Sequence, residues 1–193
     1  MDYTKSLGDF EFGGGDIKVN VTDAAYADSD FSKFVSLGGT EKDSGATLSI
    51  GAKNVHSVFG ENDLDEPKAE WVESQEITFS VTLLETSLYN IVLALGGTVS
   101  SIVDKTDVSP KYKYYRVYDT TLPNKYPFLF EVPQDASPTL KDILIMPRCE
   151  VLGAVELTYK DDDVRKVRLS LRLRKATAGA LAGKKLEVRR QHA

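Results

Sequence analysis

The sequence has little of the chemistry on which most metal and enzyme sites depend. Its 193 residues include one cysteine and two histidines. The single Cys149 excludes an intramolecular disulfide and any site with several cysteine ligands, and its apolar neighbours predict a buried thiol. His56 and His192 lie far apart, and neither has a second histidine at the spacing of a zinc site. We therefore expect no metal, no cofactor and no catalytic histidine.

Long hydrophobic runs are missing as well. No segment approaches the roughly 20 consecutive apolar residues that a membrane-spanning helix needs. The first residues, Met-Asp-Tyr-Thr-Lys-Ser, lack the basic start and the apolar stretch of a secretory signal. We expect a protein that is made and kept in the cytoplasm, without membrane insertion.

Motifs of catalysis and nucleotide binding are also absent. There is no Gly-x-Ser-x-Gly elbow. Gly13–Gly15 leads into a strand pattern, whereas phosphate loops lead into a helix. Gly179–Lys185 is one residue short of a P-loop and has Lys185 where a hydroxyl would bind magnesium. The acidic clusters at 61–66 and 161–163 lack the glycine and the distal glutamate of a calcium loop. The sequence gives no support to an enzyme.

The charge is distributed unevenly. The net charge is -5, but residues 164–193 carry +9 and residues 1–163 carry -14. Such asymmetry indicates that opposite ends of the molecule attract each other, or that the basic end binds an acidic partner. We interpret 1–175 as one domain and 176–193 as a basic segment that forms a closing helix, a closing strand or a flexible tail.

Alternation of apolar and polar residues predicts a mainly β fold. The pattern is strongest at Glu76–Leu83 and at Lys166–Arg174, whose polar face is basic. Weaker strands are predicted at Asp16–Val21, Ala46–Gly51, Lys113–Tyr118, Phe128–Val132, Asp142–Met146 and Cys149–Tyr159. Val151–Leu173 forms a plausible hairpin around an acidic turn. Prolines between 110 and 147 confine the intervening strands to edges, ends or bulges.

One segment departs from the strand pattern. Thr86–Leu95 begins with capping hydroxyls, contains no charge and stops at two glycines, Gly96 and Gly97. These signals predict a short helix. Because it is apolar nearly all round, we expect it to pack under the sheet and against a neighbouring chain. Thr22–Gly45 and Gly60–Ser74 show no strong pattern and are interpreted as long, functional loops.

Several of these segments, taken in order, resemble the tail tube proteins (major tail proteins) of long-tailed phages. The central unit is the alternating strand Glu76–Glu85 followed by the uncharged helix that closes on Leu-Gly-Gly. Upstream, Leu7–Gly14, Leu37–Thr40 and Ala46–Ser49 resemble the opening strands of that family. About half the chain is covered well, and the C-terminal half is similar only as a run of strands.

The resemblance implies a β-sandwich or barrel-like subunit with one short flanking helix and long loops. Six copies would form a ring with a continuous inner barrel, and rings would stack into a hollow tail tube through which DNA passes. The implied partners are further copies of the chain and the tape measure, tail tip and tail terminator proteins. The implied location is the virion tail, assembled in host cytoplasm. Chain size and opening motifs favour a non-contractile tail.

Residue roles follow from the resemblance as hypotheses. A polar wall that lets DNA slide is assigned to the outward residues of the alternating strand, which are Glu76, Thr78, Ser80 and Thr82. The boundary between neighbouring subunits is assigned to the helix residues Leu88, Ile91, Val92 and Leu95. Ring stacking is assigned to the two long loops, with Asp63, Asp65 and Glu66 meeting Arg168, Arg172 or Arg189 of an adjacent subunit. High salt should then weaken assembly.

Two other interpretations stay open. The first is a nucleic-acid-binding β domain that uses the basic C-terminal stretch, although no aromatic residue between Val164 and Ala193 could stack on bases. The second is an enzyme with an unrecognised site, which a 1:1 complex with a small molecule would support.

Overall fold

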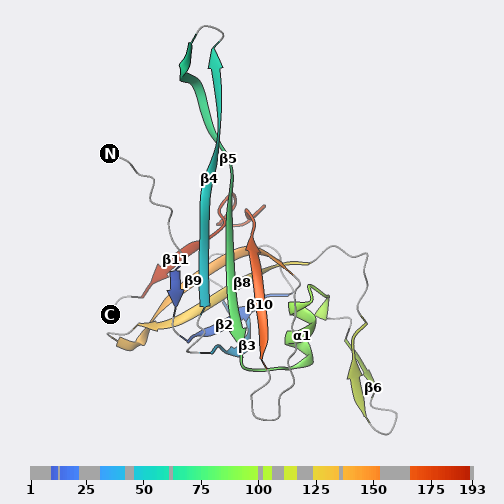
Figure 1. Cartoon of the computed structure of the whole chain (residues 1–193). Helices are drawn as coiled ribbons and strands as arrows, with labels where there is room; N and C mark the ends of the chain where they lie inside the picture. Colours follow the sequence, from blue (N-terminus) through green and yellow to red (C-terminus); the bar gives the residue numbers. More distant parts are fainter. Residues whose placement is uncertain are drawn as a thin grey trace.

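The protein is mainly β, as the alternating sequence predicts (Figure 1). The computed structural model describes residues 10–12, 14–21, 31–41, 46–60, 63–99, 102–105, 111–116, 124–134, 137–152 and 166–191. Its elements are β1 (Phe10–Phe12), β2 (Asp16–Val19), β3 (Val35–Gly39), β4 (Ala46–Gly60), β5 (Asp63–Leu83), α1 (Leu88–Ala94), β6 (Val103–Lys105), β7 (Tyr112–Tyr114), β8 (Lys125–Gln134), β9 (Ser137–Val151), β10 (Val167–Leu173) and β11 (Glu187–Arg190). All neighbouring strands in these ranges pair antiparallel.

One sheet contains most of the described strands. Its order is β1-β4-β5-β10-β9-β8-β2-β3, with β11 beside β9, while β6 and β7 form a separate hairpin. The sheet curls until the end of β3 returns to β5, where Thr40 bridges Leu83 and the Leu84 amide donates to the Gly39 carbonyl at 3.2 Å. This single bridge leaves the sheet open, and the arrangement is sandwich-like.

The hydrophobic core lies inside the curl. Ile77, Phe79, Val81 and Leu83 of β5 are buried, and Val167, Leu169, Leu171 and Leu173 of β10 are buried beside them. The register places Leu169 opposite Val81 and Leu171 opposite Phe79, so the two strongest alternating segments present their apolar faces together. Each such side chain contributes about 1.5–3 kcal/mol by leaving water, which explains why these strands show the clearest pattern.

Pro147 lies at a bulge, as the sequence allowed, but it does not end a strand. Asp142–Met146 and Cys149–Val151 belong to the single strand β9, so the predicted break at Pro147 is wrong. The ladder to β8 instead shifts at this point, because Tyr126 pairs with Cys149 and Phe128 pairs with Met146. A bulge at Pro127 and Pro147 therefore absorbs both missing amide donors. Residues 153–165, between β9 and β10, lie outside the described residues.

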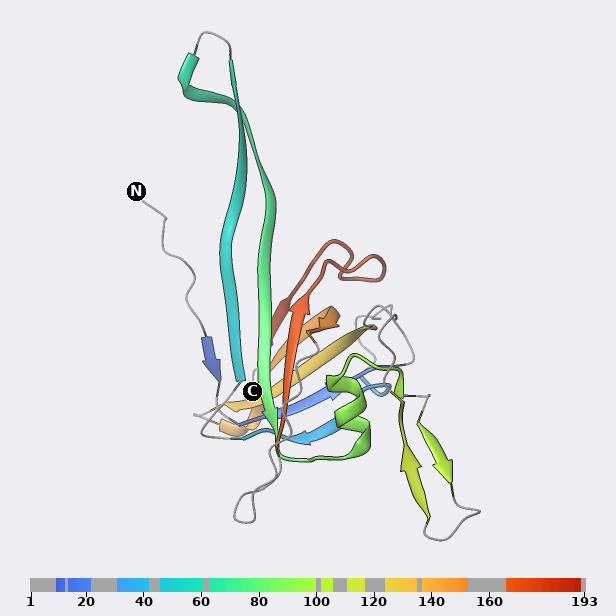
Figure 2. The same cartoon turned by 45° about the vertical axis from the view of Figure 1, so that its right-hand side comes forward.

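The predicted helix is present as α1. The Ser87 side chain accepts a hydrogen bond from the Asn90 amide at 3.2 Å, and Gly96 follows the helix with φ of 73°. The buried Asn90 side chain donates to the Leu37 and Glu85 carbonyls, both at 2.8 Å. These bonds attach the helix to β3 and to the segment that follows β5. The helix also contacts β10 and lies away from the turn end of the β4–β5 hairpin (Figure 2).

The predicted loop Gly60–Ser74 is largely strand, and the predicted loop Thr22–Gly45 contains one short strand. Val35–Gly39 is β3, and residues 63–74 belong to β5, which pairs with β4 almost to the hairpin end. We call residues 53–60 and 63–75 the arm. It projects from the sheet in Figures 1 and 2. Several register shifts interrupt it, and it has no core to face, so its sequence lacks alternation. Residues 22–30 and 42–45 lie outside the described residues.

The C-terminal segment adopts the strand alternative. Ala176 and Leu181 are buried in a second small core against Phe34, Leu129 and Ile145. β11 then pairs with β9 from Glu187 to Arg190, opposite Ile145 to Asp142. Residues 176–191 are thus fixed to the outer face of the sheet, and this packing positions the lysines of the site described below.

Candidate functional site

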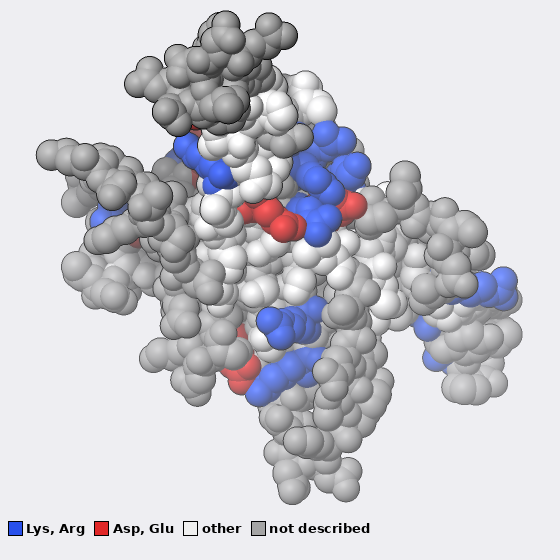
Figure 3. Space-filling view, turned by 45° about the horizontal axis from the view of Figure 1, so that its top comes forward, with Lys and Arg blue, Asp and Glu red and all other residues white. Residues whose placement is uncertain are grey.

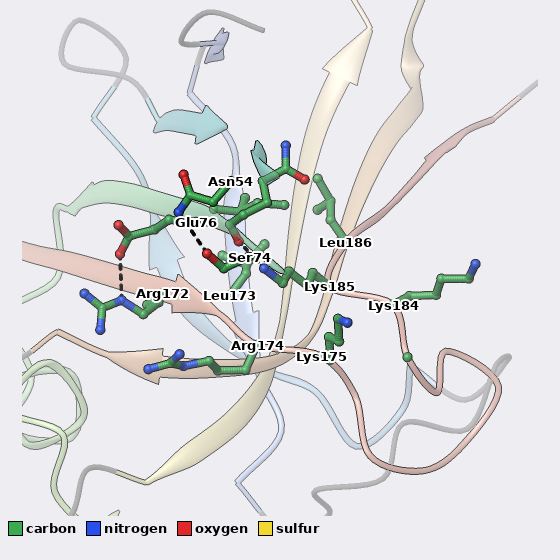
Figure 4. Close-up of a pocket in the computed structure, with 13 residues that line it drawn as sticks. Asn54, Ser74, Glu76, Arg172, Leu173, Arg174, Lys175, Lys184, Lys185 and Leu186 are labelled. Atoms are coloured by element: carbon green, nitrogen blue, oxygen red, sulfur yellow. Dashed lines mark hydrogen bonds and ion pairs between the residues drawn. The ribbon is translucent and has the colours of Figure 1, made fainter. Parts of the chain in front are cut away.

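A basic cleft of about 810 Å³ lies where the arm joins the body of the sheet (Figure 4). Three segments line it: the base of the arm, the end of β10 and the turn that leads into β11. The lining residues are Asn54, Ser74, Gln75, Glu76, Ile77, Arg172, Leu173, Arg174, Lys175, Gly183, Lys184, Lys185 and Leu186.

A tight turn brings the cations of the cleft together. The Ala176 amide donates to the Lys184 carbonyl at 2.8 Å, and the Gly183 amide donates back to the Ala176 carbonyl at 2.9 Å. Gly183 has a φ of 78°, a conformation that favours glycine. The turn therefore returns Lys184 and Lys185 to the end of β10, although ten residues separate Lys175 from Lys185 in the sequence.

Two arginines in or near the cleft already have acidic partners. The Arg172 Nε donates to Glu76 Oε1 at 2.8 Å. The Arg174 Nε and Nη2 both donate to Glu150 Oε2, at 2.8 and 2.6 Å. The hydrogen bond from Arg174 holds the pKa of Glu150 below its usual value. Within the described ranges, no carboxylate pairs with the exposed Lys175 or Lys184.

Lys185 lies in the middle of the cleft. Its Nζ donates to the Gln75 carbonyl on the arm. Figure 4 shows the side chains of Lys185 and Lys184 pointing in opposite directions. Burial lowers the pKa of Lys185, and the nearby charges of Lys175 and Arg174 lower it further. The cleft thus has an unneutralised positive potential, which suits a ligand with several carboxylate or phosphate groups.

Positively charged side chains also gather on the surface around the arm's end of the molecule. Figure 3, turned to bring the arm's end of the molecule forward, shows lysine and arginine side chains in patches with a few acidic side chains between them. The sequence indicated this only as a charge excess in 164–193. Lys175, Lys184 and Lys185 were not among the candidate residues, because their proximity depends on a turn that the sequence pattern does not specify.

The four residues assigned to a polar wall do share one face of β5. Thr78, Ser80 and Thr82 are half-buried and Glu76 is exposed. However, the register places Arg172 opposite Thr78 and Arg168 opposite Thr82. Directly opposed residues share a sheet face, so the residues assigned to the wall and two of those assigned to stacking lie on one surface.

The residues assigned to ring stacking are not brought together within the chain. Arg172 pairs with Glu76, and Arg189 contacts Glu187 two residues away on β11. Arg168 is exposed on β10. Asp63, Asp65 and Glu66 belong to the backbone of β5 at the outer part of the arm, and their side chains lie outside what the structure describes.

The four helix residues differ in exposure. Val92 is completely buried in the core of its own chain, whereas Leu88, Ile91 and Leu95 are half-buried. Only these three have surface left for a neighbouring subunit. The chain itself covers part of the apolar surface of this uncharged helix, so less of that surface is left for a neighbouring subunit than the sequence suggested.

The remaining candidates from the sequence are Cys149 and the two histidines. Cys149 is buried, and burial raises the pKa of its thiol. His56 packs on Trp71 across the arm, with ring centroids 4.8 Å apart, and His192 lies outside the described residues. Across the described ranges, no group of His, Cys, Asp and Glu could hold a metal, and no helix has the length and hydropathy to cross a membrane.

No protein-family model matches this chain, and no curated protein matches it significantly. The function is therefore argued from the arm, the open sheet and the basic cleft.

Proposed function

We propose that this protein is a structural subunit of a phage tail tube, forming hexameric rings that stack into a hollow tube for DNA. The observation that supports this most directly is the arm, a long two-stranded ribbon that leaves the body of its own chain. A ribbon of this kind is at best marginally stable alone in water, so it implies a partner that covers it.

The arm has apolar side chains that its own chain leaves uncovered. Val55 is 52% exposed and Trp71 is 50% exposed, in contrast to the buried residues of the same two strands inside the body. Polar contacts across the ribbon are few and exposed, such as that from Asn54 Nδ2 to Ser74 Oγ at 2.9 Å. Val55 pairs with Val72 and Trp71 pairs with His56, so the two exposed side chains lie on opposite faces of the ribbon. Further copies of the chain that pack on both faces would remove this surface from water.

The arm also has unpaired backbone edges. β1 pairs with β4 only at Ala46–Leu48, and β10 pairs with β5 only at Thr78–Leu83. Beyond these positions the described parts of β4 and β5 pair only with each other. Free strand edges are sites where another chain adds a strand, and closed rings remove such edges from solvent.

The polar face of β5 and β10 suits the wall of a channel. The row Ser49, Thr78, Arg172, Glu150, Lys125 crosses five neighbouring strands in register. Part of its charge is paired, since Arg172 pairs with Glu76 and Arg174 pairs with Glu150, while Lys125 and Arg168 are exposed on the same face. Such pairing lowers the net affinity of the wall for phosphates, so DNA would be held less strongly as it passes along it.

In this proposal the protein is not an enzyme and needs no cofactor. Its partners are further copies of itself and the tape measure, tail tip and tail terminator proteins, and it resides in the virion tail after assembly in host cytoplasm. A non-contractile tail remains the preferred setting.

The test is negative-stain electron microscopy of the purified full chain, concentrated at moderate salt, with light scattering for its mass. Six-membered rings or hollow tubes are the expected result. A matched variant, Trp71→Ala with Val55→Ala on the arm, should shift the chain toward monomer and keep the fold. A wild-type chain that stays at about 21 kDa at every concentration would contradict the proposal.

The basic cleft favours one second candidate, a nucleic-acid-binding domain. Its cations could neutralise backbone phosphates, with affinity that falls as salt rises. Its lining includes no aromatic side chain for base stacking, which weakens this alternative. A monomer that shifts duplex DNA at low salt, and loses the shift after Lys175→Glu and Lys184→Glu, would support it.

A further inference from the structure

The two ends of β10 differ in charge. The strand ends at Leu173 beside the cleft, where Arg174, Lys175, Lys184 and Lys185 gather. It begins at Val167, just after a link whose sequence includes the three consecutive acids Asp161–Asp163. Figures 1 and 2 both show β10 running toward the end from which the arm projects. The basic cleft and the acidic link are therefore attached to opposite ends of one strand.

The acidic link is attached at the end of β10 that lies away from the cleft of its own chain. Asp162 is five residues before Val167, so its Cα lies within about 17 Å of that residue even in an extended chain. Leu173 is about 20 Å from Val167 along the strand, and Lys175 lies beyond it. Within one chain the link would approach these lysines only by running nearly extended back along β10, whereas a second copy stacked head to tail presents its link at the cleft directly.

We propose that the basic cleft of one copy binds the acidic link, residues 161–163, of the next copy in a head-to-tail contact. The contact rests on the proposed function, because it needs copies that stack in one orientation. Each copy has one cleft and one link, which are different surfaces, so the contact does not close on itself and repeats along a stack. The cleft supplies donors for several carboxylates from Lys175, Lys184 and Lys185.

The arm carries acids too, but its position disfavours it as the occupant. The arm leaves from the same end of the sheet as the cleft, and Asn54 to Gly60 spans about 20 Å. In a stack of one orientation, the arm of one copy would have to pass the whole length of β10 of the next copy to reach that copy's cleft. Since β10 alone is about 20 Å long, the arm would need its whole length, laid along β10, to reach that cleft.

The contact also explains the unfavourable surroundings of Lys185. A partly buried ammonium beside Lys175 and Arg174 is disfavoured in the isolated chain, and the partial burial and these neighbours lower the pKa of Lys185. Carboxylates of a second copy would compensate the local positive charge. Stacking should therefore weaken as salt rises, while contacts that depend on the apolar residues of the arm should not.

Charge reversal tests the contact. The cleft variant is Lys175→Glu with Lys184→Glu, two exposed residues whose replacement should leave the fold intact. The link variant is Asp161→Lys with Asp162→Lys. Lys111→Glu with Lys113→Glu, on the β6–β7 hairpin, is the control, because it changes the net charge as much as the cleft variant does. A milder variant, Lys175→Gln with Lys184→Gln, tests the contact if charge reversal disrupts the fold. Circular dichroism checks each fold, and electron microscopy scores rings and tubes.

We expect the cleft variant and the link variant each to form rings without tubes, and the control to form tubes like the wild type. Rings of the two variants, prepared separately and then mixed, should recover tubes in which they alternate, because each reversed cleft then meets a reversed link. The glutamine variant should lose its tubes at a lower salt concentration than the wild type.

Tubes of the cleft variant at wild-type yield would overturn this inference and leave the proposed function standing. Rescue of the cleft variant by Asp63→Lys with Asp65→Lys, and not by the link variant, would assign the cleft to the arm. Unchanged tubes with lost binding of a labelled oligonucleotide would assign it to nucleic acid. A wild-type chain that forms neither rings nor tubes would overturn both proposals.

Discussion

The strands β4 and β5 run through both the body of the sheet and the arm. The two regions share antiparallel backbone pairing but differ in how far their side chains are buried. Inside the body, Leu48 and Phe79 pair directly and are 3% and 1% exposed. In the arm, His56 and Trp71 also pair directly, and Trp71 is 50% exposed. Strand pairing by itself therefore does not bury side chains. The body is stabilised by its own core, and in the proposed assembly a partner copy supplies comparable burial to the arm.

The largest expected effect is a loss of stability, and it compares alanine substitutions of Phe79 in the body and Trp71 in the arm. Phe79→Ala removes a fully buried ring that packs on Phe130 at 5.3 Å between centroids, and it should cost about 3–5 kcal/mol of unfolding free energy. Trp71→Ala in the arm should cost at most about 1 kcal/mol in the monomer. Urea unfolding under conditions that keep the chain monomeric measures both, and equal losses would contradict the comparison.

A second prediction concerns the polar bond that fixes the helix to the body. Asn90→Leu removes the donor to the Leu37 and Glu85 carbonyls and leaves buried acceptors unsatisfied. The expected loss is about 1–3 kcal/mol of unfolding free energy. Asn54→Leu removes an exposed amide of the arm and is the matched control, for which little change is expected. Thermal unfolding of the two variants side by side provides the measurement.

A smaller effect is expected at the end of the helix. Gly96 has a φ of 73°, which an alanine adopts only with strain, so Gly96→Ala should cost about 1 kcal/mol. Gly39 has no positive φ, and a methyl group added there would meet no heavy atom within 4 Å, so Gly39→Ala is the control. If both substitutions lowered the unfolding midpoint equally, backbone strain at Gly96 would not be the cause.

The smallest expected effect is the electrostatic contribution of Glu131 to stability. Burial alone would raise the pKa of Glu131, but hydrogen bonds from Lys141 at 2.6 Å and Lys18 at 2.7 Å outweigh it and lower the pKa. A carboxylate whose pKa is lowered by folding stabilises the fold above its unfolded pKa of about 4.3, and this contribution is lost as the pH falls through the folded pKa.

Glu131→Gln should therefore be less stable than the wild type at pH 6, and the difference should disappear toward pH 3. Urea midpoints at the two pH values measure this difference. A gap that persists unchanged at pH 3 would mean that the substitution acts through packing and not through the charge of Glu131.

Sequence reasoning identified the parts of the fold that face a core. The alternation in Glu76–Leu83 and Lys166–Arg174, and the capped uncharged helix, correspond to β5, β10 and α1, because burial on one face imposes a period on the sequence. The arm imposes no such period, since no core lies beside it. The sequence predicted separate strands on the two sides of Pro147, because the bulge that joins them depends on the partner strand β8, which a single segment does not reveal.

The candidate site was harder to find for a related reason. Arg172–Lys175 and Lys184–Lys185 are two short basic runs in the sequence, and Gln75 is distant from both. Only the turn from Ala176 to Gly183 brings them together, and its hydrogen bonds carry no sequence motif. The excess of positive charge was visible from composition, whereas its concentration in one cleft required the fold.

In the proposed tube, the arm is an assembly surface that a partner copy covers. Hydrogen–deuterium exchange of the full chain, compared between dilute monomer and concentrated protein, tests this claim most directly. The account predicts that amides of residues 53–60 and 63–75 become strongly protected on concentration, while those of β8 and β9 are protected in both states. Arm amides that exchange equally fast in both samples would contradict it.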